Sequence, residues 1–183
     1  VDLASCEFTR DFGAVHSDSV LSVAFSPDVR CLASARADKL CRVFEVATGE
    51  QIRALEGHTH HVLAIAWRDD GQVLVTASAD ASLKVWDVEP AVQLRTIGGF
   101  SKEVTAVQFV GQGSEFVLAA ADGTARLYNA DNGQMVRQFG GAKNALYAVA
   151  VSAQSEQLYS AGQTGYVYAW RLADGQLVTT IAE

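Results

Sequence analysis

The stretch "GHTHHVLAIAWRDDGQVLVTASADASLKVWD" (residues 57–87) carries a pattern of residue types that occurs four times along this chain of 183 residues. Three landmarks recur at intervals of 42 residues: the closing aromatic residue (Phe44, Trp86, Tyr128 and Trp170), the apolar residue that opens the unit (Val20, Val62, Val104 and Leu146), and a further apolar residue (Phe25, Trp67, Phe109 and Val151). The agreement of three independent landmarks indicates four copies of one structural unit.

The unit itself has the pattern of four short strands. Residues 62–67 are continuously apolar, as expected of an inner strand that is covered on both faces, and residues 73–77 and 83–86 are the next two β-rich runs. "DDG" at 69–71 and "ASAD" at 77–80 supply turns, and the half-polar residues 93–97 suit an outer strand. A period of about 40 to 45 residues is typical of a propeller blade. The sequence therefore predicts an all-β propeller made of four four-stranded antiparallel blades.

The expected organisation is a single segment, residues 1–183. It has an N-terminal outer strand (1–14) and four blades (15–56, 57–98, 99–140 and 141–183). "TRDF" at 9–12 resembles the outer-strand segments "IRAL" at 52–55 and "VRQF" at 136–139, and "LVTTI" at 177–181 ends the chain with another outer strand. Because a closed ring needs only one of these two terminal strands, the surplus predicts half of a larger ring of seven or eight blades.

Composition excludes several classes of partner. The chain is 49% apolar with two prolines, which suits a globular core, and its net charge of −7 argues against binding a phosphate backbone. No apolar run approaches the roughly 18 residues of a membrane helix, and the N-terminus lacks the order of a signal peptide. We therefore expect neither a nucleic acid nor a membrane as partner. The chain does not begin with Met, so an upstream segment stays open.

Four motifs give the chain a family resemblance: "GH" at 57–58, "SAD" at 78–80, "KVWD" at 84–87 and "AFSPD" at 24–28. With them the chain resembles the tryptophan-aspartate (WD) repeat β-propellers along its whole length. It also looks like repeat arrays of bacterial multidomain proteins. The family implies a hydrogen-bonded tetrad in each complete blade, which here would be His58, Thr76, Asp80 and Trp86.

The other three blades depart from this tetrad. The first has His16, Ser34 and Asp38 but ends in Phe44, which has no N–H to donate. The third has Phe100 and Leu118 beside Asp122 and Tyr128, and the fourth has Ala142 and Thr164 beside Ser160 and Trp170. We therefore expect blades one, three and four to depend more on apolar packing than on the tetrad.

Catalytic, metal and cofactor sites are not predicted. His58, His60 and His61 are close in sequence, but the tetrad uses His58 and no Cys or carboxylate lies nearby at a familiar ligand spacing. "NADNG" at 129–133 lacks the calcium-loop pattern and fits a turn in which Gly133 supplies a positive φ. The chain has no GxSxG, Walker or HExxH motif, and we expect no enzyme activity.

Cys6, Cys31 and Cys41 form no CxxC motif. Cys31 and Cys41 are expected on adjacent strands as buried free thiols, with a cross-strand disulfide as the alternative. Free thiols favour a reducing compartment and hence the cytoplasm, although the sequence leaves the localisation open.

Binding is then the expected function. In this family the loops before the inner strands and the turns after the second strands gather on one face, where peptides and proteins dock. The expected contact residues on this face are Tyr147, Gln163, His61, Glu103, Leu63, Leu21 and Thr105. Three alternatives stay open: a purely architectural half-ring, completed by a second copy as a homodimer or by missing blades; small residues at these positions serving only the crowded axis; and an accessory domain of a larger enzyme.

Overall fold

In the computed structural model, residues 18–152 and 156–182 are described, and every regular element among them is a β-strand. The first sheet contains β1 (Val20–Phe25), β2 (Cys31–Arg36), β3 (Cys41–Glu45) and β4 (Gln51–Leu55). The second contains β5 (Val62–Trp67), β6 (Val73–Ser78), β7 (Leu83–Asp87) and β8 (Val92–Ile97). The third contains β9 (Val104–Phe109), β10 (Glu115–Ala120), β11 (Ala125–Asn129) and β12 (Met135–Phe139). The fourth contains β13 (Leu146–Ser152), β14 (Gln157–Gly162), β15 (Val167–Arg171) and β16 (Leu177–Ile181).

Each sheet is an antiparallel meander whose strands follow chain order, so each sheet is one blade. The register repeats as well, because every inner strand has an irregularity near its start, between Val62 and Ala64 in the second blade. The turns after the third strands match in the first, third and fourth blades: Gly133, for example, has a φ of 73° and its amide donates to the Asn129 carbonyl, as the turn interpretation of residues 129–133 requires.

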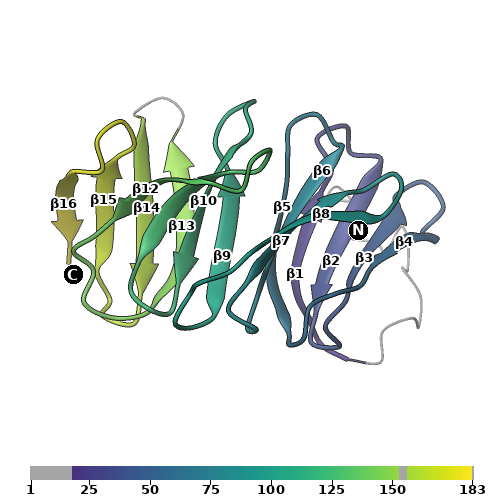
Figure 1. The fold of residues 1–183 in the computed structure, drawn as a ribbon, viewed down its shortest axis with the longest axis horizontal. Helices are drawn as coiled ribbons and strands as arrows, with labels where there is room; N and C mark the ends of the chain where they lie inside the picture. The colour runs from purple at the N-terminus through teal and green to yellow at the C-terminus, as the bar shows by residue number, and fades with distance from the viewer. Residues whose placement is uncertain (1–17, 153–155, 183) are drawn as a thin grey trace, which may run out of the picture.

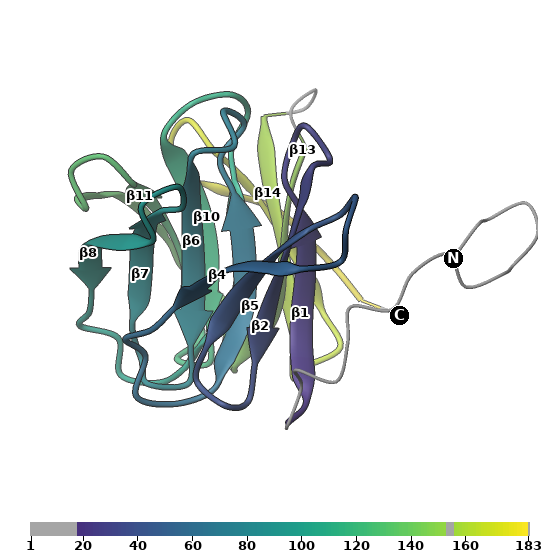
Figure 2. The same ribbon diagram turned by 90° about the vertical axis from the view of Figure 1, so that its right-hand side faces the viewer.

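The four blades follow one another from the first to the last, as the colours in Figure 1 show. Their inner strands form a row in which β5 packs against β1 and β9, and β9 packs against β13. Figure 1 shows β4 on the far side of its blade from β1, and Figure 2 shows β8 lying away from β5. Among the described strands, β1 and β13 make no comparable contact, so the row does not close into a ring. The predicted fold class is confirmed, and the arrangement is that of an incomplete propeller.

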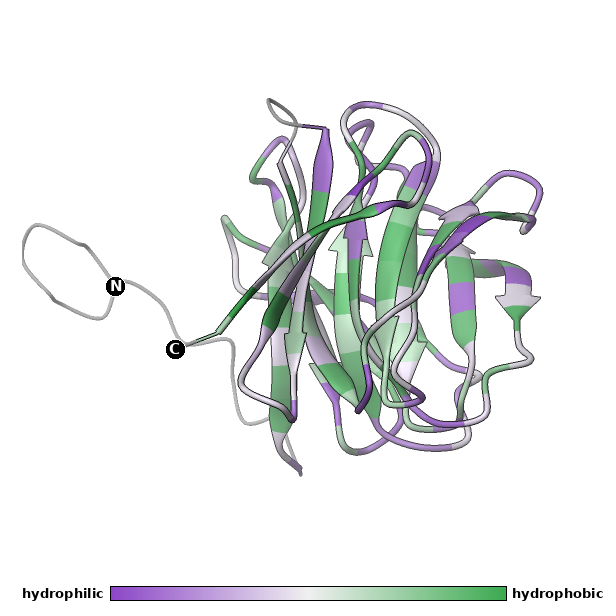
Figure 3. Ribbon diagram, turned by 90° about the vertical axis from the view of Figure 1, so that its left-hand side faces the viewer, coloured by the Kyte–Doolittle hydropathy of each residue, from purple (hydrophilic) through white to green (hydrophobic). Residues whose placement is uncertain are grey.

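The core consists of three apolar layers, one at each junction between neighbouring blades. Between the first two blades, Val43 and Leu55 pack with Trp67, Leu74 and Trp86. Equivalent clusters join the second blade to the third and the third to the fourth. Figure 3 shows apolar residues along the strands and hydrophilic residues mostly in the turns. The second and third blades therefore use both faces for packing, which explains why their inner strands lack the alternation of a half-exposed sheet.

Beyond the strands, the described part of the chain contains no helix that could cross a membrane.

Candidate functional site

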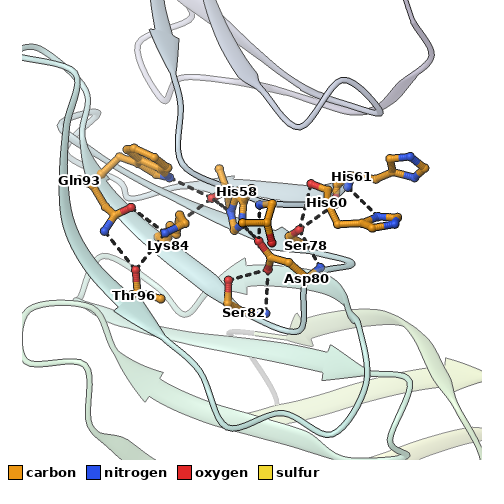
Figure 4. Close-up of polar contacts among 12 residues, drawn as sticks. His58, His60, His61, Ser78, Asp80, Ser82, Lys84, Gln93 and Thr96 are labelled. Atoms are coloured by element: carbon orange, nitrogen blue, oxygen red, sulfur yellow. Dashed lines mark hydrogen bonds and ion pairs between the residues drawn. The ribbon is translucent and has the colours of Figure 1, made fainter.

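A chain of hydrogen bonds runs through the second blade (Figure 4). The Trp86 indole Nε1 lies 2.9 Å from the Thr76 hydroxyl oxygen, which lies 2.7 Å from Nε2 of His58. Nδ1 of the same imidazole lies 2.7 Å from Oδ2 of Asp80. Burial lowers the pKa of His58, and the Asp80 carboxylate opposes this shift only in part. The imidazole is therefore neutral: Nδ1–H donates to Asp80, and Nε2 accepts the hydroxyl proton of Thr76.

Asp80 anchors the turn after β6. Burial by itself raises the pKa of Asp80, but hydrogen bonds from Ser82, the Thr59 amide and His58 outweigh it and hold the pKa at about 2. Figure 4 shows the Ser82 contacts and the His58 contact reaching the same carboxylate. The ionised carboxylate therefore ties the loop that carries His58 to the turn after β6.

This group of side chains has the residue types of a hydroxyl, imidazole and carboxylate triad, but it cannot act as one. Thr76 has no exposed surface, and its oxygen already accepts a hydrogen bond from the Trp86 indole N–H. A nucleophile must reach a reacting atom of its substrate. The geometry therefore supports a structural role for the network.

The third blade replaces the network with a cation. The Arg126 guanidinium lies 4.7 Å from the centre of the Phe100 ring, and its Nη2 lies 2.9 Å from Oδ2 of Asp122. Phe100 and Tyr128 also pack together, with ring centres 6.1 Å apart. Asp122 thus keeps an ionic partner although the histidine is missing. The spacing of four residues between Asp122 and Arg126 is the sequence signal that could have revealed this pair.

The fourth blade satisfies its tryptophan through the backbone. The Trp170 indole donates to the Gly140 carbonyl at 2.7 Å, and the Ser160 hydroxyl donates to the Ala148 carbonyl at 2.6 Å. In the first blade, Asp38 pairs with Arg36 and Arg42 at 2.8 and 2.7 Å, and Ser34 is buried. The prediction for His16 lies outside the described residues, as do the expected N-terminal strand and Cys6.

One backbone clamp recurs in all four blades and positions the expected docking face. In each blade, the amide of the residue before the turn donates to the carbonyl of the loop residue before the inner strand. The pairs are Ala37 with Ser19 at 3.0 Å, and Ala79 with His61, Ala121 with Glu103 and Gln163 with Ala145 at 2.9 Å. These paired segments form one face, which we call the inner-loop face. The clamp holds two sets of predicted contact positions side by side.

A hollow of about 490 Å³ opens on the inner-loop face between the second, third and fourth blades. Its lining combines apolar, polar and charged side chains: Leu63, Lys102, Glu103, Thr105, Ala121, Ala145, Tyr147 and Gln163. The structure thus brings together five of the predicted contact residues: Tyr147, Gln163, Glu103, Leu63 and Thr105. Lys102 is a lining residue that the sequence interpretation missed. It directly precedes Glu103, a neighbourhood that could have identified it.

The lining residues differ in how free they are to meet a ligand. Tyr147 is 54% exposed, and Gln163 and Glu103 are exposed as well. The Thr105 hydroxyl, in contrast, lies 2.7 Å from the Leu146 carbonyl and donates its proton across the junction between blades. Thr105 therefore positions β13, whereas Tyr147, Gln163 and Glu103 are available to a partner.

Two predicted contact residues lie apart from the hollow. His61 is exposed, and its ring packs against that of His60 with centres 4.4 Å apart. Leu21 is 45% exposed on β1, at the open end of the row of inner strands. Among the described residues, no group of three or more His, Cys, Asp or Glu side chains is arranged to hold a metal ion.

Cys31 and Cys41 are free thiols. Cys31 pairs in register with Glu45, and Cys41 pairs with Ala35, so the two cysteines lie at different positions along the strand pair. Burial raises the pKa of both thiols, which leaves them protonated.

The four antiparallel blades, the shared clamp and the tryptophan network define a β-propeller built from sequence repeats. A family model described as "WD domain, G-beta repeat" matches residues 7–45, 49–87 and 91–129, which is more than half of the chain. The chain therefore belongs to the WD repeat family, and the resemblance seen in its motifs is confirmed. The fourth sheet adds a further blade beyond the matched residues.

Solved structures agree with this assignment. The chain is similar to "Structure of U3-55K" and "Crystal structure of RRP9 WD40 repeats", each with a TM-score of 0.85 and 22% sequence identity over 91% of this chain. It covers 53% and 52% of those chains, and so spans about half their length. At this identity the likeness shows the fold. No curated protein matches the chain.

Proposed function

We propose that this chain is a noncatalytic scaffold that docks a protein or peptide on its inner-loop face. The observation that carries the proposal is the hollow of about 490 Å³, because its lining combines apolar residues with exposed polar groups. WD repeat propellers are in general interaction scaffolds without catalytic activity, which supports the same function. The buried position of Thr76 and His58 also favours binding over catalysis.

The lining suggests the chemistry of the ligand. Leu63, Ala121 and Ala145 offer a shallow apolar surface, and Tyr147 stands beside it with a large exposed ring. Tyrosine is favoured at binding hot spots because it buries a large area at a small entropic cost. The Gln163 amide can pair with a peptide backbone, since it both donates and accepts. An extended peptide with one apolar anchor residue fits these groups best.

The test is binding of selected peptides to variants of the face. Peptides recovered from a random display library on the wild-type chain should bind Tyr147→Ala about tenfold or more weakly. They should bind Arg95→Ala, on the outer strand β8, as tightly as the wild type. Peptides that are insensitive to Tyr147→Ala would count against this face.

The second candidate is the architectural function, in which further blades complete the row of four blades, which we call the arc, into a ring. The specific observation in its favour is that the two end faces expose apolar residues whose counterparts are buried inside the arc. Val20 is 42% exposed, for example, whereas Val62 and Val104 are fully buried. Soluble proteins rarely leave large apolar faces uncovered. This function and the docking function are compatible, because they use different surfaces.

A further inference from the structure

We propose that two copies of this chain associate head to tail, with the first blade of each packed on the fourth blade of the other, to form an eight-bladed ring. The inference rests on the architectural function above and deepens it by naming the partner that completes the ring. It is carried by the two end faces and by the register of the junctions inside the arc.

The first end face is the side of the first blade on which no other described strand packs. Val23 is 60% exposed on β1, whereas Ile65, its counterpart on β5, is 6% exposed. Phe25 is 55% exposed, whereas Trp67 is 9% exposed. The face thus has the apolar pattern of an interior junction without the neighbour that would bury it.

The second end face is the opposite side of the fourth blade. Ile181 is 53% exposed, although Leu55, Ile97 and Phe139 are buried at the same position of the other blades. The inner strands of this face form a hollow of about 180 Å³, lined by Ala148, Val149, Ala150, Tyr159, Ser160, Ala161 and Val167. Small alanines beside a hollow leave room for larger side chains from a partner.

The junctions inside the arc show how these faces would meet. β5 packs on β1 and β2, β9 packs on β5 and β6, and β13 packs on β9 and β10. Repeating this packing once more would place β1 of a second copy on β13 and β14, over the hollow of about 180 Å³. At the first junction the Trp67 indole donates to the Ala24 carbonyl at 3.0 Å. In the repeated register, Phe25 of one copy lies over Ala150 of the other.

A second copy fits this surface because the chain itself carries both halves of the junction. A two-fold axis would form two identical junctions and cover both end faces at once, which closes the assembly. Eight blades lie within the range known for propellers. The chain covers 53% and 52% of the two solved chains that it resembles, so an arrangement of this size accounts for about half of each. The ring would also place Leu21 of one copy beside Tyr147 of the other, making the inner-loop face continuous.

The new junction would lack one contact that two interior junctions possess. Arg53 donates to the Glu89 carbonyl at 2.7 Å, and Arg137 donates to the Leu172 carbonyl at 2.6 Å. The same position of the fourth blade is Thr179, whose shorter side chain cannot span that gap. The association should therefore be reversible, and Thr179→Arg should strengthen it.

The experiment is light scattering coupled to size exclusion on the full 183-residue chain over a range of concentrations. We expect twice the chain mass of 19.5 kDa. Val23→Arg should raise the dimer dissociation constant about 100-fold or more, because it buries an unpaired charge at both junctions. Val92→Arg is the matched control: Val92 is 50% exposed on the outer strand β8, so the dimer should persist. Circular dichroism checks that both variants fold.

The outcomes distinguish association with a second copy from completion of the ring by other blades. A folded monomer that binds an apolar dye such as ANS would contradict association with a second copy, but completion of the ring by other blades would remain supported. A folded monomer that binds no dye overturns both. A dimer that resists Val23→Arg, or that Thr179→Arg fails to strengthen, contradicts the proposed head-to-tail junction.

Discussion

Nε2 of His58 lies 2.7 Å from the hydroxyl oxygen of Thr76, and this contact joins the buried indole of Trp86 to the ionised carboxylate of Asp80. The Thr76 hydroxyl is central, because it accepts one hydrogen bond and donates another. A network of this kind stabilises a fold only when each member is satisfied.

Trp86→Phe should lower the free energy of unfolding by about 1–3 kcal/mol, since it removes the indole N–H together with ring atoms. Chemical denaturation measures this. Thr76→Val and the double variant complete the cycle, and we expect the two changes to be non-additive because the residues share one hydrogen bond. Phe44→Leu, at the equivalent position of the first blade, removes no hydrogen bond. A silent Trp86→Phe variant would mean that the indole bond contributes nothing.

Acid should destabilise the second blade in two stages. The pKa of His58 is lowered in the fold, so the unfolded chain takes up this proton first and stability declines as the pH falls below 6.5. The pKa of Asp80 is lowered from 3.8 to about 2, so its contribution is complete above pH 3.8 and is lost as the pH falls through that interval.

Unfolding curves at a series of pH values between 7 and 2 check both stages. His58→Gln should flatten the first stage and Asp80→Asn the second. Equal slopes in His58→Gln and the wild type would refute the assignment of the first stage.

Gly162→Ala should destabilise the fourth blade by about 1–3 kcal/mol or more, because the added Cβ would overpack the junction with the loop before β13. That Cβ would overlap the Ala145 carbonyl oxygen. Gly98→Ala is the control, since its Cβ would meet no atom within 4 Å. Thermal melts of the two variants should differ clearly. Indistinguishable melts would show that β13 can shift without cost.

Arg126→Met should lower stability by about 1–2 kcal/mol, since it removes the cation above Phe100 and leaves Asp122 without its ion pair. Arg171→Met provides the comparison, because Arg171 pairs with Asp174 at the surface, where ion pairs contribute little. Equilibrium denaturation of both variants gives the difference. If the two changes cost the same, the cation in the third blade has no special role.

Much of the fold follows from spacing alone, because a strict interval of 42 residues between Phe44, Trp86, Tyr128 and Trp170 requires one unit to be repeated. Side-chain identity also predicts that His58, Thr76, Asp80 and Trp86 lie together, since each has a hydrogen-bonding group that another can pair with. The acceptor of Trp170 could not be foreseen, because the Gly140 carbonyl is a backbone group that every residue has.

The hollow on the inner-loop face could likewise not be predicted from the sequence alone. Register places Tyr147 and Gln163 near one another, but the hollow is also lined by Leu63 from the second blade and Ala121 from the third. Its shape therefore results from packing between blades, which no local pattern encodes. The role of Thr105 changed for the same reason, because its hydroxyl partner lies on the next blade.

The central claim is that a partner docks in the hollow beside Tyr147. The most direct test is isothermal titration of library-selected peptides into the wild type, Leu63→Asp, Tyr147→Ala and the outer-strand control Leu94→Asp. We predict a loss of affinity of about tenfold or more for the first two variants and none for the control. Peptides that bind Leu63→Asp and Tyr147→Ala with wild-type affinity but fail on Leu94→Asp would contradict the account.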